Sequence, residues 1–275
     1  MKKNNVSWIE ITTRVGCKVN CEYCPQDKFI KEYSKISNVT QLSFDVFKKC
    51  IDKVPKNIYI VFSGFSEPWL NPECTKMILY ANKNKYKIMI YTTGIGMTES
   101  DIDLIKKIPF KDFTVHLPEN RGYTKIKIDQ NYLQILNKLY KSNISNIRWI
   151  YQAPEKRECI HPKLNNFIKR KKIKLFKWPI TSRAGNLENI KNKPKRKKGN
   201  ILNCSRLNAN ILLPNGDVVL CCMDWNLKHI LGNLLKTNYR SLFKSKEFKN
   251  ILKELKENSS NILCRTCEWA KLSNK

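Results

Sequence analysis

The chain has 275 residues, of which 41% are hydrophobic and 10% aromatic, a composition typical of a folded globular protein and not of a disordered one. Its formal net charge is +29, from 52 Lys and Arg against 23 Asp and Glu. No secretion signal opens the chain, and no apolar run approaches the roughly 18 residues of a membrane-spanning helix. We therefore expect a cytoplasmic protein whose 11 cysteines bind metal or take part in catalysis rather than forming disulfides.

The excess of positive charge has two interpretations. It could attract partners that carry phosphate, or it could reflect lysines spread over solvated surfaces. One dense basic run is present, KNKPKRKKGN at 191–200. Its Pro, Gly and repeated like charges favour a solvated linker over a binding helix. We therefore expect no nucleic-acid partner.

Short β-type runs alternate with helical stretches over the first two thirds of the chain. We predict strands at 8–13, 58–62, 87–92, 112–117, 146–151 and 172–178. Between them we predict helices over 44–54 after Ser43, over 73–84 after Pro72, from Thr98 in a capping box with Asp101, and over 130–142 and 162–171. Repeated βα units predict an α/β fold with a parallel sheet, most simply a partial (β/α)6 barrel of the TIM type.

The pattern changes after the basic run. NANILLPNGDVVLCC at 208–222 predicts a β-hairpin, because Pro-Asn-Gly at 214–216 favours a tight turn. A helix is predicted over 239–257, and CRTC follows at 264–267. We expect a barrel domain at 1–186, a basic linker at 187–203 and a small hairpin-plus-helix domain at 204–275.

Four motifs follow predicted strands. They are CKVNCEYC at 17–24 after the first strand, SGFSEP at 63–68 after the second, TTG at 92–94 at the end of the third, and SRAGN at 182–186 after the sixth. The carboxyl ends of parallel barrel strands lie on one face, where such folds place their active sites. The four motifs are therefore expected to form one site.

The first motif supplies three thiols, Cys17, Cys21 and Cys24, within eight positions. A closed zinc site uses four ligands, whereas a cubane iron–sulfur cluster held by three cysteines keeps one iron open for a substrate or cofactor. We favour the cluster, with a zinc knuckle that lacks one ligand as the alternative.

The C-x3-C-x2-C spacing, with Tyr23 before the last cysteine, resembles the signature of the radical S-adenosylmethionine (SAM) superfamily. The resemblance implies a [4Fe–4S] cluster whose open iron chelates SAM, and a 5′-deoxyadenosyl radical that abstracts hydrogen. SGFSEP is similar to the superfamily's GGEP element, although Phe65-Ser66 stand where the second glycine is expected, and TTG is similar to its TNG-type turn. On this resemblance we expect SAM contacts from Tyr23, Gly64, Ser66, Glu67, Thr92, Thr93, Ser182 and Arg183.

The C-terminal cysteines resemble the start of the SPASM pattern, which continues further in its full form. A shortened version, the twitch domain, carries one auxiliary cluster. The resemblance implies that a second, fully ligated [4Fe–4S] cluster is held by Cys204, Cys221, Cys264 and Cys267. A zinc site with four cysteine ligands is the alternative.

The four remaining cysteines have other expected places. We expect Cys50 and Cys74 in the core and Cys222 on the opposite face of its strand from Cys221. Cys159 lies in QAPEKRECI, after the fifth strand, where a thiol could return a hydrogen atom to a substrate radical.

Three residues are catalytic candidates. Besides Cys159, His116 at the end of the fourth strand is a candidate substrate contact or proton acceptor, with a structural histidine as the alternative. Arg183 could contact SAM or substrate, or act as an ordinary capping or surface arginine. Tyr91 and Glu10 are weaker candidates of the same kind.

In size and cysteine layout the chain resembles small twitch-domain radical SAM dehydrogenases and epimerases that act on aminocyclitols and sugars. This resemblance implies oxidation or epimerisation of a hydroxyl-bearing carbon in a sugar-like substrate, free or linked to phosphate or a nucleotide. It also implies an external electron donor such as flavodoxin or ferredoxin, and we expect a monomer. The alternative is a radical SAM enzyme that modifies peptides or proteins.

Overall fold

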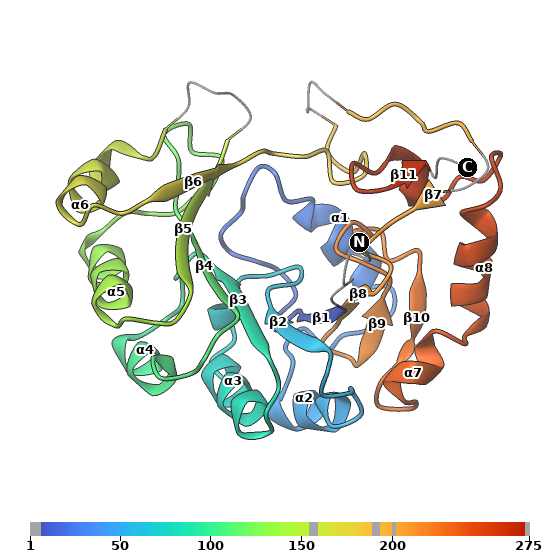
Figure 1. Cartoon of the computed structure of the whole chain (residues 1–275), viewed down its shortest axis with the longest axis horizontal. Coiled ribbons are helices and arrows are strands. Elements are labelled where there is room, and N and C mark those ends of the chain that lie inside the picture. Colours follow the sequence, from blue (N-terminus) through green and yellow to red (C-terminus); the bar gives the residue numbers. More distant parts are fainter. Residues whose placement is uncertain (1–6, 154–158, 189–192, 200–201, 273–275) are drawn as a thin grey trace, which may run out of the picture.

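The computed structural model describes residues 7–153, 159–188, 193–199 and 202–272. Within these residues, nine strands form one curved sheet in the order β10-β9-β8-β1-β2-β3-β4-β5-β6 (Figure 1). Each of the first six strands pairs in parallel with the next. They are β1 (Trp8–Ile11), β2 (Tyr59–Phe62), β3 (Ile88–Thr92), β4 (Asp112–His116), β5 (Ile147–Gln152) and β6 (Leu175–Trp178). The predicted α/β fold with a parallel sheet is confirmed.

The connecting helices cover the outer face of the sheet (Figure 1). They are α2 (Phe44–Ile51), α3 (Cys74–Lys83), α4 (Glu99–Ile105), α5 (Gln130–Lys141) and α6 (Asn165–Arg170), with the 3-10 turns η1 (Pro68–Leu70) and η2 (Pro162–Leu164) before α3 and α6. Ser43 accepts a hydrogen bond from the Val46 N–H, and Thr98 and Asp101 form a reciprocal capping box. Both predicted helix starts are therefore confirmed.

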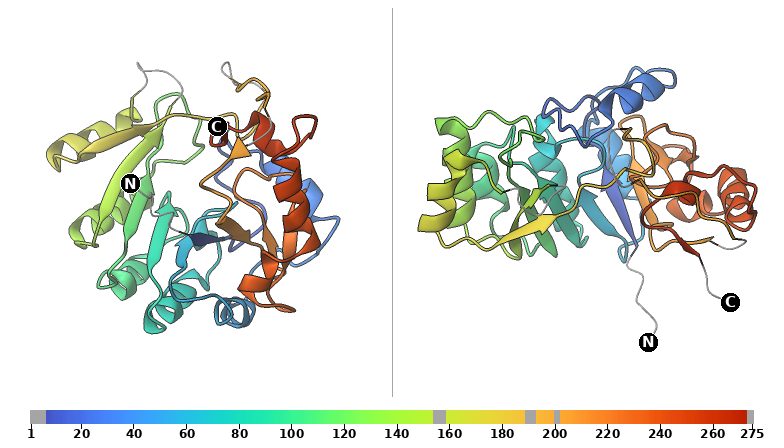
Figure 2. Two further views of the ribbon diagram at one scale, coloured as in Figure 1. Left: turned by 45° about the vertical axis from the view of Figure 1, so that its right-hand side comes forward. Right: turned by 90° about the horizontal axis from the view of Figure 1, so that it is seen from above.

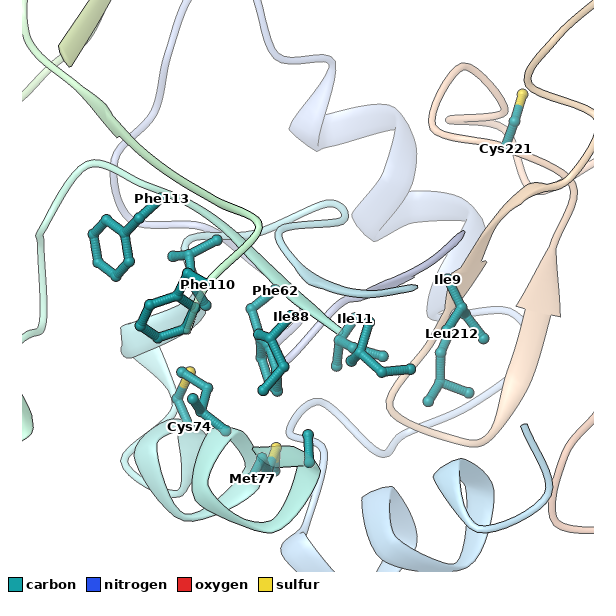
Figure 3. Close-up of a cluster of buried hydrophobic side chains, with 14 of the residues drawn as sticks. Ile9, Ile11, Phe62, Cys74, Met77, Ile88, Phe110, Phe113, Leu212 and Cys221 are labelled. Atoms are coloured by element: carbon teal, nitrogen blue, oxygen red, sulfur yellow. The ribbon is translucent and has the colours of Figure 1, made fainter. Parts of the chain in front are cut away.

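The main core lies between these helices and the outward face of the strands. Because side chains alternate along a strand, Ile9 and Ile11 of β1 face the helices, where they join Phe62 and Met77 (Figure 3). Cys50 and Cys74 are fully buried in this layer, as predicted. The intervening positions of the strands face the barrel interior, which is where the motifs gather.

Helix α1 (Gln26–Tyr33) was not predicted, and it organises a second core. The Phe29 ring of α1 lies 4.7 Å from the ring of Phe65, which in turn lies 4.6 Å from the ring of Trp225. Phe65 is only 1% exposed. The aromatic residue that replaces the expected second glycine of the SGFSEP motif therefore fills a space between α1 and the C-terminal region.

The predicted hairpin is present as β8 (Ala209–Leu212) and β9 (Asp217–Val219), and β10 (Ile230–Asn233) pairs with β9. Strand β8 also pairs in parallel with β1, in the register Trp8 with Ala209. The C-terminal region therefore continues the barrel sheet at its β1 edge, whereas α5 and α6 lie at the other end (Figures 1 and 2). The predicted domain limits remain predictions, but the two parts share one sheet.

The single helix predicted over 239–257 was wrong. The segment forms two helices, α7 (Tyr239–Leu242) and α8 (Lys246–Glu254). Ser245 causes the break, because its side chain accepts a hydrogen bond from the Phe248 N–H and so starts a new helix. The 3-10 turn η3 (Leu263–Thr266) follows and carries the CRTC sequence.

Part of the predicted linker, residues 189–192 and 200–201, lies outside the described residues. Its middle part contacts the C-terminal cysteine segment: Lys197 Nζ donates to the Cys267 carbonyl at 2.6 Å, and Arg265 Nη1 donates to the Gly199 carbonyl at 2.6 Å. Two short strands, β7 (Leu202–Asn203) and β11 (Lys271–Leu272), pair nearby. Within the described part of the chain, no helix is long and apolar enough to cross a membrane.

Candidate active site

A cavity of about 140 Å³ opens at the carboxyl ends of the barrel strands. Its lining comes from the loops after β1 and β2 and from the ends of β3, β4, β5 and the segment after β6. The structure thus brings most of the predicted site together, namely Cys17, Cys21, Tyr23, Cys24, Gly64, Ser66, Glu67, Thr92, Thr93, His116 and Arg183. The expectation that the separate motifs share one face agrees with this geometry.

The three N-terminal cysteines sit in an environment with several hydrogen-bond donors. Burial raises the pKa of Cys17 to about 11, and the backbone N–H groups of Val19 and Glu67 act in the opposite direction. Burial also raises the pKa of Cys24, opposed first by the positive charge of Arg183 and then by a hydrogen bond from Gln26. Buried thiols that face such donors are suited to bind a metal as thiolates. These residues fit an iron–sulfur cluster.

Gln26, the first residue of α1, fixes the cysteine loop. Its Nε2 donates to the Phe65 carbonyl at 2.6 Å, and its Oε1 accepts from the Cys17 N–H at 3.4 Å. The loop after β1 and the loop after β2 are therefore joined by one side chain. Sequence reasoning did not find Gln26, because the position of α1 could not be read from the short pattern after the cysteines.

Glu67 connects the SGFSEP and TTG motifs. Its Oε2 accepts hydrogen bonds from the Thr93 N–H and hydroxyl, both at 2.7 Å, and its Oε1 accepts from the Thr92 hydroxyl. Burial raises the pKa of Glu67 to about 7, and these donors oppose the rise by stabilising the ionised form. The carboxyl group is thus held in one orientation at the cavity wall, next to the cysteines.

Gly64 allows the loop after β2 to lie against the end of β1. Its φ is +68°, and a Cβ atom there would lie 2.4 Å from Thr12 Oγ1 and 2.9 Å from the Thr12 nitrogen. The Gly64 N–H donates to Glu10 Oε2 at 3.3 Å, as does the Ser63 hydroxyl at 3.1 Å. Glycine is required at this position by both the backbone conformation and the close approach.

His116 lies in the deeper part of the cavity, edge-on to Trp178 with ring centroids 5.6 Å apart. Burial, and secondly the positive charge of Arg183, lower the pKa of His116 to about 3. The imidazole is therefore neutral at physiological pH. Because it lines the cavity, the His116 side chain faces the barrel interior.

Arg183 has a left-handed backbone conformation, with φ of +53°, and its Nε donates to the Tyr23 carbonyl at 3.3 Å. The Tyr23 hydroxyl shares a 2.6 Å hydrogen bond with Thr124. Arg183 thus lines the cavity beside the cysteine loop instead of lying at the surface.

Two predicted residues are placed elsewhere. Ser182 is buried, but its N–H donates to Glu268 and its Oγ accepts from the Gly185 N–H at 2.9 Å, so it shapes the turn beside the cavity without lining it. Cys159 is exposed, and its backbone exchanges hydrogen bonds with Asn120. Residues 154–158 of its loop lie outside the described residues.

A polar cluster beneath the cavity was missed by sequence reasoning. Asp112 accepts hydrogen bonds from the Arg148 guanidinium on both oxygens, from the Tyr91 hydroxyl at 3.1 Å and from the Thr114 hydroxyl at 2.8 Å. Tyr91 and Gln152 both line the cavity. Gln152 could have been predicted from the sequence, because it is the last residue of β5 in the same way that His116 is the last residue of β4.

The C-terminal cysteines form a second set, brought together from the loop between β7 and β8, the loop after β9, and η3 with the residue that follows it. The Arg206 N–H donates to Cys204 Sγ and the Trp269 N–H donates to Cys267 Sγ, each at 3.4 Å. Burial raises the pKa of Cys264 to about 12, and the neighbouring Cys204 and Cys267 raise it further. Thiols that accept backbone N–H bonds fit cluster ligation.

Within the described residues, no three His, Cys, Asp or Glu side chains converge closely enough to bind a single metal ion. In an iron–sulfur cubane each cysteine binds a different iron, so its ligands surround the cluster and do not converge on one atom.

The fold and the two cysteine sets together define the class of barrel proteins that hold iron–sulfur clusters at the carboxyl edge of the sheet. Residues 11–150 match the model of the radical SAM superfamily, and residues 204–268 match the SPASM model, an iron–sulfur cluster-binding domain. The chain therefore belongs to the radical SAM superfamily. Membership implies a [4Fe–4S] cluster and SAM, and the SPASM match implies an auxiliary iron–sulfur cluster.

The chain is similar to the S-adenosyl-L-methionine-dependent 2-deoxy-scyllo-inosamine dehydrogenase of Niallia circulans, with 21% identity over 95% of this chain and 92% of that protein. Its fold is similar to that of BtrN in complex with AdoMet and 2-DOIA (TM-score 0.61, 17% identity, 92% of this chain and 88% of BtrN). It is also similar to Streptococcus suis SuiB bound to the precursor peptide SuiA (TM-score 0.64, 11% identity, 95% and 69%). A third similar fold is that of anSMEcpe with bound AdoMet (TM-score 0.61, 13% identity, 96% and 86%).

Proposed function

We propose that this protein is a radical SAM dehydrogenase that oxidises a hydroxyl-bearing carbon of a small aminocyclitol- or sugar-type substrate. The observation that carries the proposal is the second cysteine set, four thiols of which Cys204 and Cys267 accept backbone N–H bonds, in a short region that shares the barrel sheet. The dehydrogenase of Niallia circulans, similar over nearly the whole length of both chains, supports the same chemistry.

In this proposal Cys17, Cys21 and Cys24 hold the cluster that binds SAM, and together these cofactors supply the 5′-deoxyadenosyl radical. The chain's own contribution is orientation. Glu67, held by Thr92 and Thr93, presents a fixed carboxyl group at the cavity wall. A fixed carboxyl group suits the amino group of SAM, because it forms a charge-assisted hydrogen bond without reorganising.

Neutral His116 is suited to hydrogen bonding with a substrate hydroxyl and unsuited to keeping a proton, because its pKa is lowered to about 3. Gln152 and Tyr91 add polar groups to the same cavity. Such a lining matches a substrate that carries several hydroxyl or amino groups.

At the other set, four cysteines leave no open position, so a cluster held there is restricted to electron transfer. Oxidation of a carbinol carbon needs one electron to leave after the hydrogen atom and the hydroxyl proton, and the closed set supplies a place for it. Epimerisation instead needs a hydrogen donor at the cavity. The exposed position of Cys159 favours oxidation over epimerisation.

Peptide modification is the second candidate, favoured by the fold similarity to SuiB bound to its precursor peptide. Under this alternative the cavity receives one residue of a peptide and the flanking surface holds the rest. The two candidates differ in the substrate that is consumed.

The test is anaerobic reconstitution followed by reaction with SAM, dithionite and either 2-deoxy-scyllo-inosamine or a peptide library. We expect about eight irons per chain, and 5′-deoxyadenosine in a one-to-one ratio with a ketone product. Ketone formation from the aminocyclitol supports oxidation. Incorporation of solvent deuterium without ketone supports epimerisation, and products from the peptides alone overturn the proposal.

A further inference from the structure

The guanidinium of Arg206 lies between the C-terminal cysteines and the barrel. It is 4.1 Å from the ring centroid of Trp269 and 5.9 Å from that of Trp8, and its Nη1 donates to Cys222 Sγ at 3.3 Å. The cation thus contacts two aromatic rings and one sulfur atom. The Glu10 carboxylate and the Cys221 thiol also interact electrostatically with this cation, although neither is among its hydrogen-bond partners.

The backbone ties the same residue to the proposed cluster ligands. The Arg206 N–H donates to Cys204 Sγ at 3.4 Å, so the guanidinium belongs to the loop that presents Cys204. Cys222, which receives its side-chain hydrogen bond, follows Cys221 directly in the chain. The backbone of Arg206 thus contacts one member of the four-cysteine set, Cys204, and its cation interacts electrostatically with a second, Cys221.

Arg206 is also connected to the cavity side of the barrel. Trp8, on which it packs, donates from Nε1 to Glu10 Oε1 at 3.1 Å. The other oxygen of Glu10 accepts from the Ser63 hydroxyl and the Gly64 N–H, both on the loop that lines the cavity. One continuous set of contacts thus runs from the cavity wall to the loop of Cys204.

We propose that Arg206 is a positioning residue that raises the reduction potential of the auxiliary cluster. The reduced cluster carries one more negative charge than the oxidised cluster, and a fixed cation beside its ligands stabilises the reduced state. The aromatic faces and the sulfur of Cys222 hold the guanidinium close to the loop that carries Cys204. This inference rests on the proposed function, which places a cluster on the C-terminal cysteines.

The substrate carbon loses a hydrogen atom to the deoxyadenosyl radical, and its hydroxyl loses a proton to solvent. One electron then leaves the resulting radical, which becomes a ketone, and the auxiliary cluster is reduced by that electron. A higher potential at the acceptor makes this transfer more favourable.

The test is a potentiometric titration of the anaerobically reconstituted protein, followed by EPR, without substrate. Arg206→Gln should shift the midpoint potential of the auxiliary cluster to a more negative value, whereas Arg206→Lys, which keeps the charge, should shift it less. The SAM-binding cluster in the same sample should not move. Arg240→Gln, at an exposed position on α7, removes one charge elsewhere in the C-terminal region and should leave both potentials unchanged.

Four results would overturn the inference. An unchanged auxiliary potential in Arg206→Gln, or equal shifts in the Gln and Lys variants, would show that the charge has no such role. If the wild-type protein held only about four irons, the auxiliary cluster itself and the inference would both be wrong, and product analysis would still judge the rest of the proposed function. If Arg206→Gln does not bind iron, Trp269→Leu replaces it, because this variant removes an aromatic ring that holds the guanidinium and keeps the backbone N–H bond to Cys267. We then expect a smaller negative shift of the auxiliary potential. No shift would contradict the inference.

Discussion

The two cysteine sets differ in the number of thiols and in what lies beside them. Cys17, Cys21 and Cys24 face a cavity lined by polar side chains, whereas the four C-terminal cysteines pack among residues of the core. A set of three with space beside it can bind a further molecule at the metal, and a set of four without space cannot. Under the proposed function, the difference in ligand count and access separates bond-breaking chemistry at the first set from electron transfer at the second.

The largest expected effect comes from the open set. Cys21→Ser should reduce SAM cleavage to background and remove about four of about eight irons, because two thiolates do not hold the cluster. Iron analysis and 5′-deoxyadenosine measurement by chromatography test this. Cys50→Ser, at a core cysteine, is the matched control and should keep the iron content. Full SAM cleavage by Cys21→Ser would contradict the assignment.

The closed set should respond differently. Cys221→Ser should also remove about four irons, yet SAM cleavage without substrate should stay within about threefold of the wild type, since the first cluster remains. Formation of the oxidised product should fall to background. If Cys221→Ser and Cys21→Ser abolish SAM cleavage equally, the separation of roles between the two sets is wrong.

A smaller effect is expected on protein stability from a substitution next to the three-cysteine set. Gly64→Ala should lower the free energy of unfolding by roughly 3 kcal/mol, because it combines a positive φ with a Cβ placed 2.4 Å from Thr12 Oγ1. Chemical denaturation of the protein measures this. Gly122→Ala is the control, since Gly122 has φ of +73° and no atom within 4 Å of the added Cβ; we expect a loss of about 1 kcal/mol there. Equal losses would show that the close approach to β1 does not matter.

The last expected effect concerns how the stability of the folded protein depends on pH. The folded protein keeps His116 neutral down to about pH 3, whereas the unfolded chain binds a proton below about pH 6.5. The unfolded state thus holds more protons in this range, and His116 makes stability fall as pH decreases, by up to about 1.4 kcal/mol per pH unit. His116→Asn should remove this part of the slope in denaturation curves recorded from pH 7 to pH 4. An unchanged slope in His116→Asn would contradict the enclosure of His116 in the cavity wall.

Much of the fold and of the open site could be predicted because both depend on local patterns. The alternation of β-type runs and capped helices predicted all six parallel strands, and the strand ends predicted which motifs would meet. The long C-terminal helix was predicted wrongly, because the sequence of 239–257 reads as one helix, although the first helix ends at Leu242 and Ser245 caps the start of a second one. Cys159 was expected near the site on the same rule, but the rule places a loop and not the direction of one side chain within it.

The sequence by itself determined the order of the elements and which motifs follow the strand ends, and it predicted the cluster ligands, because these depend on residue type and spacing along the chain. Only the tertiary structure decided that β8 pairs with β1, that Phe65 fills the space between α1 and Trp225, and that Arg206 lies beside the C-terminal cysteines. These contacts join residues far apart in the chain. Their formation depends on which surfaces remain unburied after the local elements have formed, and no local pattern records that.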